Sequence, residues 1–252
     1  HEVRDRTMAI CAPLRVEDPV VQPVADVSPP KWHLGHTTWF FEQFILKDLP
    51  GYTPFSPDMA YMFNSYYETV GKRVLRADRG NMTQPTLEEV HAYRRHVNER
   101  LGELLDRGMD DPELLRVLEL GLNHEQQHQE LLVTDMKYIL GNNPLFPAYG
   151  NFNEGAREEG KRSFIAVPGE LYDIGFQGDG FSFDNEHGRH TEYVDDFAIS
   201  DRLVTNGEFM AFMEAGGYRN FEHWHADGWQ WVQDNRVEAP LYWHRIDGLW
   251  HH

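Results

Sequence analysis

One long segment, from Pro112 to Gly141, carries apolar residues at helical spacing. Residues that recur every three or four positions lie on one face of a helix. The members of that face are Leu114, Leu118, Gly121, His124, His128 and Leu131. Two histidines therefore interrupt a stripe that should face a protein core, where a buried imidazole needs a partner. The segment predicts a long helix that brings two histidines into the interior of a helical domain.

Three further helical patterns precede this segment. They cover residues 31–47, 59–70 and 86–107, and the last begins with the capping box Thr86-Leu-Glu-Glu. The sequence Gly-Asn-Asn-Pro at 141–144 marks the end of the long helix. Four helices with short connections predict a four-helix bundle over residues 1–145.

The composition changes after the last of these helices. Residues 143–160 are rich in Pro, Gly, Asn and charge, and we interpret them as a linker. Short strand-like runs follow at 163–167 and 191–199, with glycine-rich turns between them and a short helix from Thr205. We therefore expect an α+β protein, with a helical domain over residues 1–145 and a mixed domain over residues 160–252.

The charge and the cysteine content exclude several classes of protein. A formal net charge of -18 disfavours nucleic acids and anionic membranes as partners. Cys11 is the one cysteine, so no internal disulfide and no cysteine zinc cluster can form. No apolar run approaches the ~20 residues of a membrane span, and no signal peptide is visible. These features lead us to expect a cytoplasmic protein.

His124 and His128 are the strongest candidate functional residues. They are four residues apart, so both imidazoles can reach one metal ion from the same helical face. Glu130 lies ~240° around the helix from His124 and ~200° from His128, and we expect it to point away from the ion. A third ligand should come from another helix, where His33 and His36 are candidates. The more central position of His36 slightly favours it.

Three neutral imidazoles suit Fe(II), Zn(II), Ni(II) or Cu(II), and they leave coordination positions open for a substrate. An open site of this kind is catalytic rather than structural. The alternative is two solvated histidines on a helix surface. Arguments from residue spacing alone lead to a three-histidine metal site in a helix bundle and do not choose the metal.

Four motifs in a fixed order carry a family resemblance. They are residues 28–42, which contain Trp32-His-Leu-Gly-His36, and residues 124–130, 183–190 and 201–212. In these motifs the chain resembles the ergothioneine-biosynthesis sulfoxide synthases. The resemblance implies a DinB-like four-helix bundle followed by a formylglycine-generating-enzyme-like domain of the C-type-lectin kind.

The resemblance also implies an activity. Fe(II) would be bound by His36, His124 and His128, with O2 as co-substrate. The sulfur of cysteine or γ-glutamylcysteine would be joined to the imidazole of hercynine (Nα-trimethylhistidine), giving a sulfoxide. In the family the second domain continues beyond the position of His252, so we expect a C-terminal remainder to take part.

Several other residues are assigned roles through the resemblance. Gln127 matches a glutamine that hydrogen-bonds the substrate imidazole, and it lies ~60° from His124 on the helix. Tyr66 and Tyr67 resemble active-site aromatics, of which one could donate a proton during catalysis. For both assignments the alternative is an ordinary solvated or core side chain.

Arg73, Arg76 and Arg79 recur at every third position. Guanidinium groups bind carboxylates in two-point contacts, so the series suits a clamp for an amino-acid substrate. A cluster of surface arginines is the alternative.

Two other functions stay open at this stage. A DinB-type, thiol-dependent S-transferase or hydrolase with zinc or nickel would use the same three histidines, although the appended second domain argues against it. A non-enzymatic, lectin-like binding module whose histidines store metal is the further alternative. Formylglycine-generating activity needs paired cysteines, which the chain lacks.

Overall fold

A computed structural model describes residues 1–65, 72–150 and 160–251. The chain divides into two compact units, residues 1–153 and 154–252, and each is described by itself. The predicted linker at 143–160 falls partly outside the described residues. No helix in the described part of the chain has both the length and the apolar composition that crossing a membrane requires.

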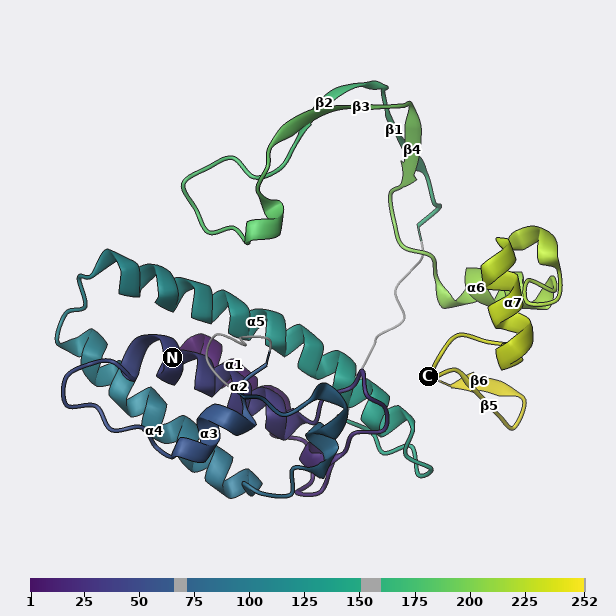
Figure 1. The fold of residues 1–252 in the computed structure, drawn as a ribbon. Coiled ribbons are helices and arrows are strands. Elements are labelled where there is room, and N and C mark those ends of the chain that lie inside the picture. Colours follow the sequence, from purple (N-terminus) through teal and green to yellow (C-terminus); the bar gives the residue numbers. More distant parts are fainter. Residues whose placement is uncertain (66–71, 151–159, 252) are drawn as a thin grey trace. The chain divides into compact units, whose positions relative to one another are not determined.

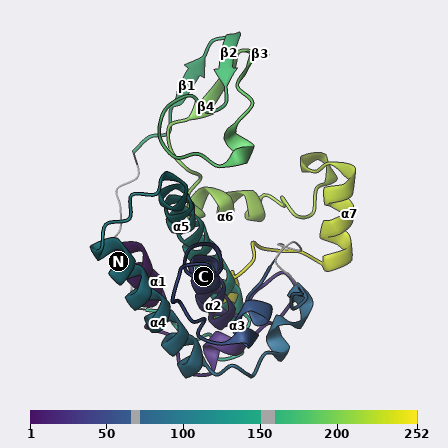
Figure 2. The ribbon, with the colours of Figure 1, turned by 60° about the vertical axis from the view of Figure 1, so that its left-hand side comes forward.

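The first unit is a helix bundle (Figures 1 and 2). Its long helices are α1 (Glu2–Cys11), α2 (Pro30–Phe41), α4 (Leu87–Asp106) and α5 (Pro112–Gly141). Helix α2 packs against both α4 and α5, and α1 packs against α5. A π-helical turn, η2 (Glu42–Leu46), extends α2, and a short α3 (Pro57–Met62) packs beside it. Two 3-10 turns, η1 (Asp18–Val20) and η4 (Arg76–Asn81), lie in the connections.

The predicted capping box at Thr86 and the predicted helix start at Pro112 are confirmed. At α4, Thr86 and Glu89 form the reciprocal capping box. At α5, the Asp111 carboxylate accepts hydrogen bonds from the backbone N–H groups of Glu113 and Leu114, and Pro112 occupies the first turn. Local signals therefore set where the two longest helices begin.

The helix predicted over residues 59–70 is wrong. Helix α3 ends at Met62. The next residues, Asn64 and Ser65, are not helical, and residues 66–70 lie outside the described residues. Its place in the bundle is taken by α1, whose buried side chains are polar, Arg4 and Thr7. A helix with a polar buried face gives no apolar stripe, and for this reason the sequence did not reveal it.

Helix α2 lies at the centre of the bundle, and every one of its residues from Pro30 to Phe41 is buried. A helix that is enclosed on all sides is apolar around most of its circumference. The hydrophobic core, to which α2 itself contributes, contains Trp32, Leu34, Trp39, Phe40, Phe41, Ile45, Leu46, Met59, Phe63, Met82, Val90, Tyr93, Val97 and Leu101. Any polar side chain of α2 must therefore find its partners inside the protein.

The core-facing stripe of α5 differs from the predicted one at its C-terminal half. Leu131 is 46% exposed, whereas Leu132 is fully buried. The buried face continues from His128 at intervals of four and seven residues, through Leu132 and Asp135. Gly121 keeps its predicted place, because a Cβ there would lie 2.6 Å from the Phe41 ring.

A buried ionic cluster ties α1, α4 and α5 together. The Glu125 carboxylate is fully buried and pairs with the guanidinium of Arg4 at 2.8 Å and with that of Arg94. It also accepts a 2.6 Å hydrogen bond from the Thr7 hydroxyl. Burial by itself would raise the pKa of Glu125, but the two guanidinium groups and the hydrogen bonds lower it overall.

The described part of the second unit, residues 160–251, contains three separate two-stranded antiparallel sheets and two helices. Strand β1 (Phe164–Val167) pairs with β4 (Phe197–Ser200), β2 (Glu170–Ile174) with β3 (His190–Val194), and β5 (His244–Ile246) with β6 (Leu249–His251). The helices are α6 (Asn206–Glu214) and α7 (Ala226–Asn235), and 3-10 turns η5 (Asp184–Glu186) and η6 (Phe221–His223) lie between elements. The expected α+β class, a helical region followed by a mixed one, is confirmed.

Apolar side chains of these small sheets are exposed. Ile165 and Ile199 face each other across β1 and β4, and each is 56% exposed. A two-stranded sheet has too little surface to bury its own side chains. The bundle is therefore the better packed of the two units.

We predict that Glu125→Gln destabilises the protein by about 3–5 kcal/mol, because two buried guanidinium groups then lose their counter-charge. Urea unfolding followed by circular dichroism measures the change. Glu130→Gln removes the same charge from an exposed position on the same helix and should change the free energy of unfolding by less than about 0.5 kcal/mol. Equal effects of the two substitutions would contradict the assigned importance of the cluster.

Candidate metal centre

Three histidines from two helices meet in the bundle. The candidate ligand atoms of His36 on α2 and of His124 and His128 on α5 all lie within 4.8 Å of one another. Their ring centroids are 4.6–5.1 Å apart. Two imidazole nitrogens bound to one ion at about 2.1 Å lie at most about 4.2 Å apart. Small side-chain rotations are enough to bring these three nitrogens onto a common ion.

His36 is held by one backbone carbonyl. Its Nδ1 lies 2.7 Å from the carbonyl oxygen of Phe63. A carbonyl only accepts, so Nδ1 carries the proton and Nε2 has the free lone pair. Gly35 makes this approach possible, because a Cβ at that position would lie 2.3 Å from the Phe63 ring.

His128 is held by a second histidine. Its Nδ1 lies 2.9 Å from Nδ1 of His33, and Nε2 of His33 lies 2.9 Å from the Asp135 carboxylate. The structure thus places His36 in the three-histidine group and His33 behind it, in contact with His128. His33 contacts a candidate ligand and is not one of the three.

His124 supplies the third imidazole. It is half-buried, and its Nδ1 is enclosed without a hydrogen-bond partner among the described residues. An enclosed ring nitrogen with no partner is unfavourable in a protein that binds nothing there. The free nitrogen fits a site that is completed by a bound ion.

Aromatic rings enclose the group. Trp32 stacks on the His36 ring at 4.5 Å, and Trp39 lies on the same ring at 5.5 Å. The Phe40 ring lies 4.9 Å from that of His124. These apolar surroundings have a low dielectric constant, which disfavours a positive charge on the imidazoles.

The same surroundings lower the pKa of each candidate ligand. Burial lowers the pKa of His36 and of His128 well below the usual value, and the neighbouring imidazoles lower both further. Burial lowers the pKa of His124 to about 4. All three rings are therefore neutral near pH 7, with lone pairs available to a metal.

This donor set fits a divalent transition metal. It consists of neutral imidazole nitrogens without thiolates or carboxylates, a composition typical of iron, zinc, copper or nickel sites. Glu130 is exposed and has no place in the group. The neighbouring Glu125 points into the ionic cluster of Arg4 and Arg94.

Comparisons with known proteins agree with this geometry. The model of the DinB superfamily matches residues 1–132, more than half of the 252 residues. The chain belongs to the DinB superfamily. A second model, described as the sulfatase-modifying factor enzyme 1-like domain, matches residues 150–247. The DinB bundle carries all three histidines.

Two curated relatives align with this chain across both matched regions. A protein named "Hercynine oxygenase" from Mycolicibacterium smegmatis is 26% identical over 223 residues, which cover 86% of this chain and 50% of that protein. Another from Mycolicibacterium thermoresistibile is 24% identical over 250 residues, 96% of this chain and 53% of that protein. A third, from Mycobacterium tuberculosis, is 40% identical over 62 residues. The chain spans about half the length of the first two relatives, and the family resemblance found in the sequence is confirmed.

The three arginines of the predicted carboxylate clamp make separate contacts. Arg79 is 6% exposed, its guanidinium lies 3.3 Å from the centroid of the Trp32 ring, and its Nη1 donates to the Ser28 hydroxyl at 2.8 Å. Arg73 donates to the Ser65 carbonyl at 3.0 Å, and Arg76 donates to the Asp26 carbonyl. Arg79 thus contacts the Trp32 ring, which stacks on the candidate metal ligand His36.

The other predicted substrate-binding and catalytic residues are Gln127, Tyr66 and Tyr67. Gln127 is exposed on α5, three residues after His124 and therefore near the same helical face. Tyr66 and Tyr67 lie outside the described residues. Their roles stay predictions.

Sequence reasoning missed the contact between His33 and Asp135. A signal for it exists, because Asp135 follows His128 by seven residues and so lies only ~20° from it on the helix. A carboxylate on the buried stripe beside a candidate ligand indicates a supporting contact. The partner of Asp135, on α2, could not be read from that spacing.

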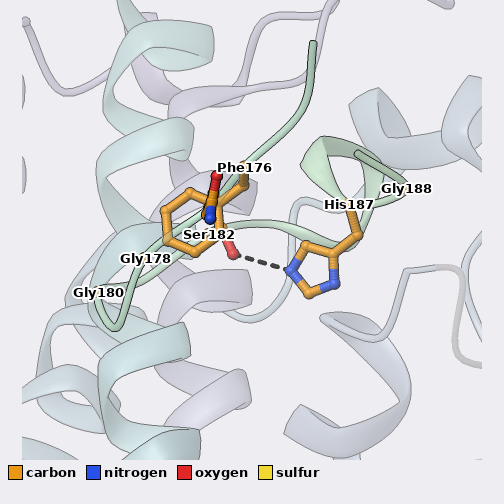
Figure 3. Close-up of a pocket in the computed structure, with 7 residues that line it drawn as sticks. Phe176, Gly178, Gly180, Ser182, His187 and Gly188 are labelled. Carbon is orange, nitrogen blue, oxygen red and sulfur yellow. Dashed lines mark hydrogen bonds between the residues drawn. The ribbon is translucent and has the colours of Figure 1, made fainter. Parts of the chain in front are cut away.

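A second polar pair lies in the other unit, in an open pocket formed by loops (Figure 3). The Ser182 hydroxyl lies 2.8 Å from Nε2 of His187, and Phe176 stacks on the His187 ring at 6.3 Å. A catalytic serine needs a group that orients its histidine. No carboxylate hydrogen-bonds His187 in the part of the chain that the structure describes, so the pair does not form a triad.

We predict that His128→Ala abolishes metal retention and leaves the helices intact. The loss of affinity should exceed the roughly 10–100-fold that removal of a supporting residue costs. Metal analysis after anaerobic purification, with circular dichroism for folding, measures both effects. His91→Ala, on α4 and outside the group, is the control and should retain metal. Full metal content in His128→Ala would remove it from the ligand set.

We also predict that the metal-free protein becomes less stable as the pH falls from 6.5 to 5.5. The unfolded chain takes up protons at its histidines near pH 6.5, whereas the pKa values of His36, His124 and His128 are lowered in the folded state. The unfolded state therefore binds more protons in this range, and the free energy of unfolding decreases. The expected decrease is about 1 kcal/mol per histidine, measured by urea unfolding. His124→Gln should remove the contribution of one histidine to this decrease. A free energy of unfolding that does not change between pH 6.5 and 5.5 would contradict burial of the histidines in the neutral form.

Proposed function

We propose that the chain acts as a non-haem, Fe(II)-dependent hercynine oxygenase of the sulfoxide synthase type. The reaction joins the sulfur of cysteine or γ-glutamylcysteine to the imidazole carbon of hercynine. One O2 takes four electrons, two for the new C–S bond and two for the sulfoxide oxygen, and its second oxygen leaves as water. The observation that carries the proposal is the three-histidine group inside a DinB bundle that is followed by the second matched region.

His36, His124 and His128 would hold the metal. Fe(II) bound there would supply a site for O2 and favour the thiolate form of the thiol substrate. Neutral ligands suit this task, because they leave the full charge of the ion to act on what binds beside it. Three protein ligands also leave positions for both organic substrates, which turns a reaction of separate molecules into one between neighbours.

Other residues of the bundle would bind and shield. Trp32, Trp39 and Phe40 keep water from the imidazoles on the side of the core. Gln127 is exposed beside His124, a position suited to a hydrogen bond with a substrate imidazole. Arg79 adds a buried positive charge behind Trp32 and favours anionic substrates near the centre. A carboxylate clamp of Arg73, Arg76 and Arg79, and Tyr66 or Tyr67 as proton donor, complete the proposed machinery.

The partners that follow are small molecules, hercynine and a cysteine-type thiol. The charge of -18 disfavours nucleic acids and anionic membranes. We place the protein in the cytoplasm as part of this proposal, where a reducing environment keeps the thiol substrate reduced.

The competing function is a zinc- or nickel-dependent S-transferase or hydrolase built on the same histidines. The second matched region favours the oxygenase, because the curated relatives that share both regions carry that name. A metal-storing binding module would not require the neutral, aromatic-lined centre described above.

We predict that the purified protein loaded with Fe(II) converts hercynine and a thiol to a sulfoxide in air. Mass spectrometry of reactions with cysteine and with γ-glutamylcysteine would identify both the product and the preferred thiol. Product should be absent without O2, with Zn(II) in place of Fe(II), and in His128→Ala, while His91→Ala should retain activity. Thiol transfer or hydrolysis by the Zn(II) protein without sulfoxide formation by the Fe(II) protein would favour the competing function.

A further inference from the structure

A chain of buried hydrogen bonds runs from His128 away from the three-histidine group. Nδ1 of His128 lies 2.9 Å from Nδ1 of His33, and Nε2 of His33 lies 2.9 Å from Oδ2 of Asp135. The backbone N–H of Ser28 donates to the same Oδ2 at 2.9 Å. All four residues are buried, at 2–8% exposure. These hydrogen bonds lead from His128 on α5 to His33 on α2 and back to Asp135 on α5, two helical turns after His128.

The Asp135 carboxylate at the end of this series determines which atom donates in each hydrogen bond. A carboxylate only accepts, so Nε2 of His33 carries a proton. A neutral imidazole carries one proton, and the contact with Asp135 places the proton of His33 on Nε2. Its Nδ1 must then accept, which requires the proton of His128 to be on Nδ1. Nε2 of His128 is left with its lone pair, which is the form that binds a metal.

The other tautomer of His128 would place a proton on the nitrogen that a metal needs. Without an acceptor at Asp135, a neutral His33 could carry its proton on Nδ1 and donate it to His128. His128 would then carry its own proton on Nε2, where a metal would have to bind. His36 avoids this ambiguity, because the Phe63 carbonyl fixes its proton on Nδ1 directly.

We propose that Asp135 and His33 are positioning residues that hold His128 in the tautomer whose Nε2 is open to a metal. The inference rests on the three-histidine centre of the proposed function and extends it beyond the ligands. Metal-binding histidines commonly donate their second N–H to a carboxylate or carbonyl. Here an imidazole transmits the effect of the carboxylate to the ligand.

Two substitutions of Asp135 separate its shape from its hydrogen bonding. Leucine in Asp135→Leu has a similar volume and no acceptor, so His128 should no longer be restricted to the tautomer protonated on Nδ1. Asp135→Asn keeps an acceptor oxygen, which the Ser28 N–H orients toward His33, and should largely restore the wild-type behaviour. Glu130→Leu is the matched control, because it removes a carboxylate from an exposed position of the same helix.

The first measurement is the ring-nitrogen NMR spectrum of the metal-free protein labelled with 15N-histidine. Wild type and Asp135→Asn should show His128 protonated on Nδ1, whereas Asp135→Leu should show protonation at Nε2 as well. The second measurement is Co(II) binding followed by visible absorption. Asp135→Leu should weaken binding by about 10–100-fold, and Glu130→Leu should match wild type. Circular dichroism confirms that each variant is folded.

The possible failures are distinct. If His128 of the wild type carries its proton on Nε2, or if Asp135→Leu changes neither the tautomer nor the Co(II) affinity, the positioning role is overturned. If the wild type shows the expected tautomer and binds no metal, the metal centre and the proposed function fail while the hydrogen-bond assignment stands.

Discussion

Complete burial of α2 is the constraint on which the bundle and its candidate site depend. The polar side chains of this helix lie away from water, so most of them bond to groups inside the protein. The hydroxyls of Thr37 and Thr38 bond to carbonyls one turn back, at 3.1 and 2.8 Å. His33 and His36 find Asp135 and a backbone carbonyl. Both ring nitrogens of His33 are hydrogen-bonded, whereas the bond from Nδ1 of His36 leaves its Nε2 free for a metal.

The long helix α5 serves two polar systems that do not share partners. His124 and Glu125 are adjacent in sequence, so their side chains leave the helix about 100° apart. The histidine reaches the metal centre, and the glutamate reaches Arg4 and Arg94. The ionic cluster fixes the position of α5 against α1 and α4, and the histidine pair is held in place by that packing. A stable charged cluster thus lies beside a centre whose imidazoles are kept neutral.

Burial has opposite consequences for folding and for metal binding. Desolvation lowers the pKa values of the three candidate ligands and makes the metal-free centre sensitive to acid. The same neutral rings offer lone pairs near pH 7 without first releasing a proton. A bound ion would also give a partner to ring nitrogens that have none in the metal-free protein, such as the enclosed Nδ1 of His124. Binding of an ion would therefore stabilise the folded chain.

The sequence by itself determined the relations within each helix. Spacing placed His124 and His128 on one face and Glu130 away from it, and the capping box located the start of α4. Only the tertiary structure decided which residues meet across helices. It placed His36 in the group and His33 behind His128, buried the polar face of α1, and brought Asp135 to α2. The physical reason is that helical periodicity gives angles about one axis, whereas a buried polar side chain is stable only with a partner from another helix.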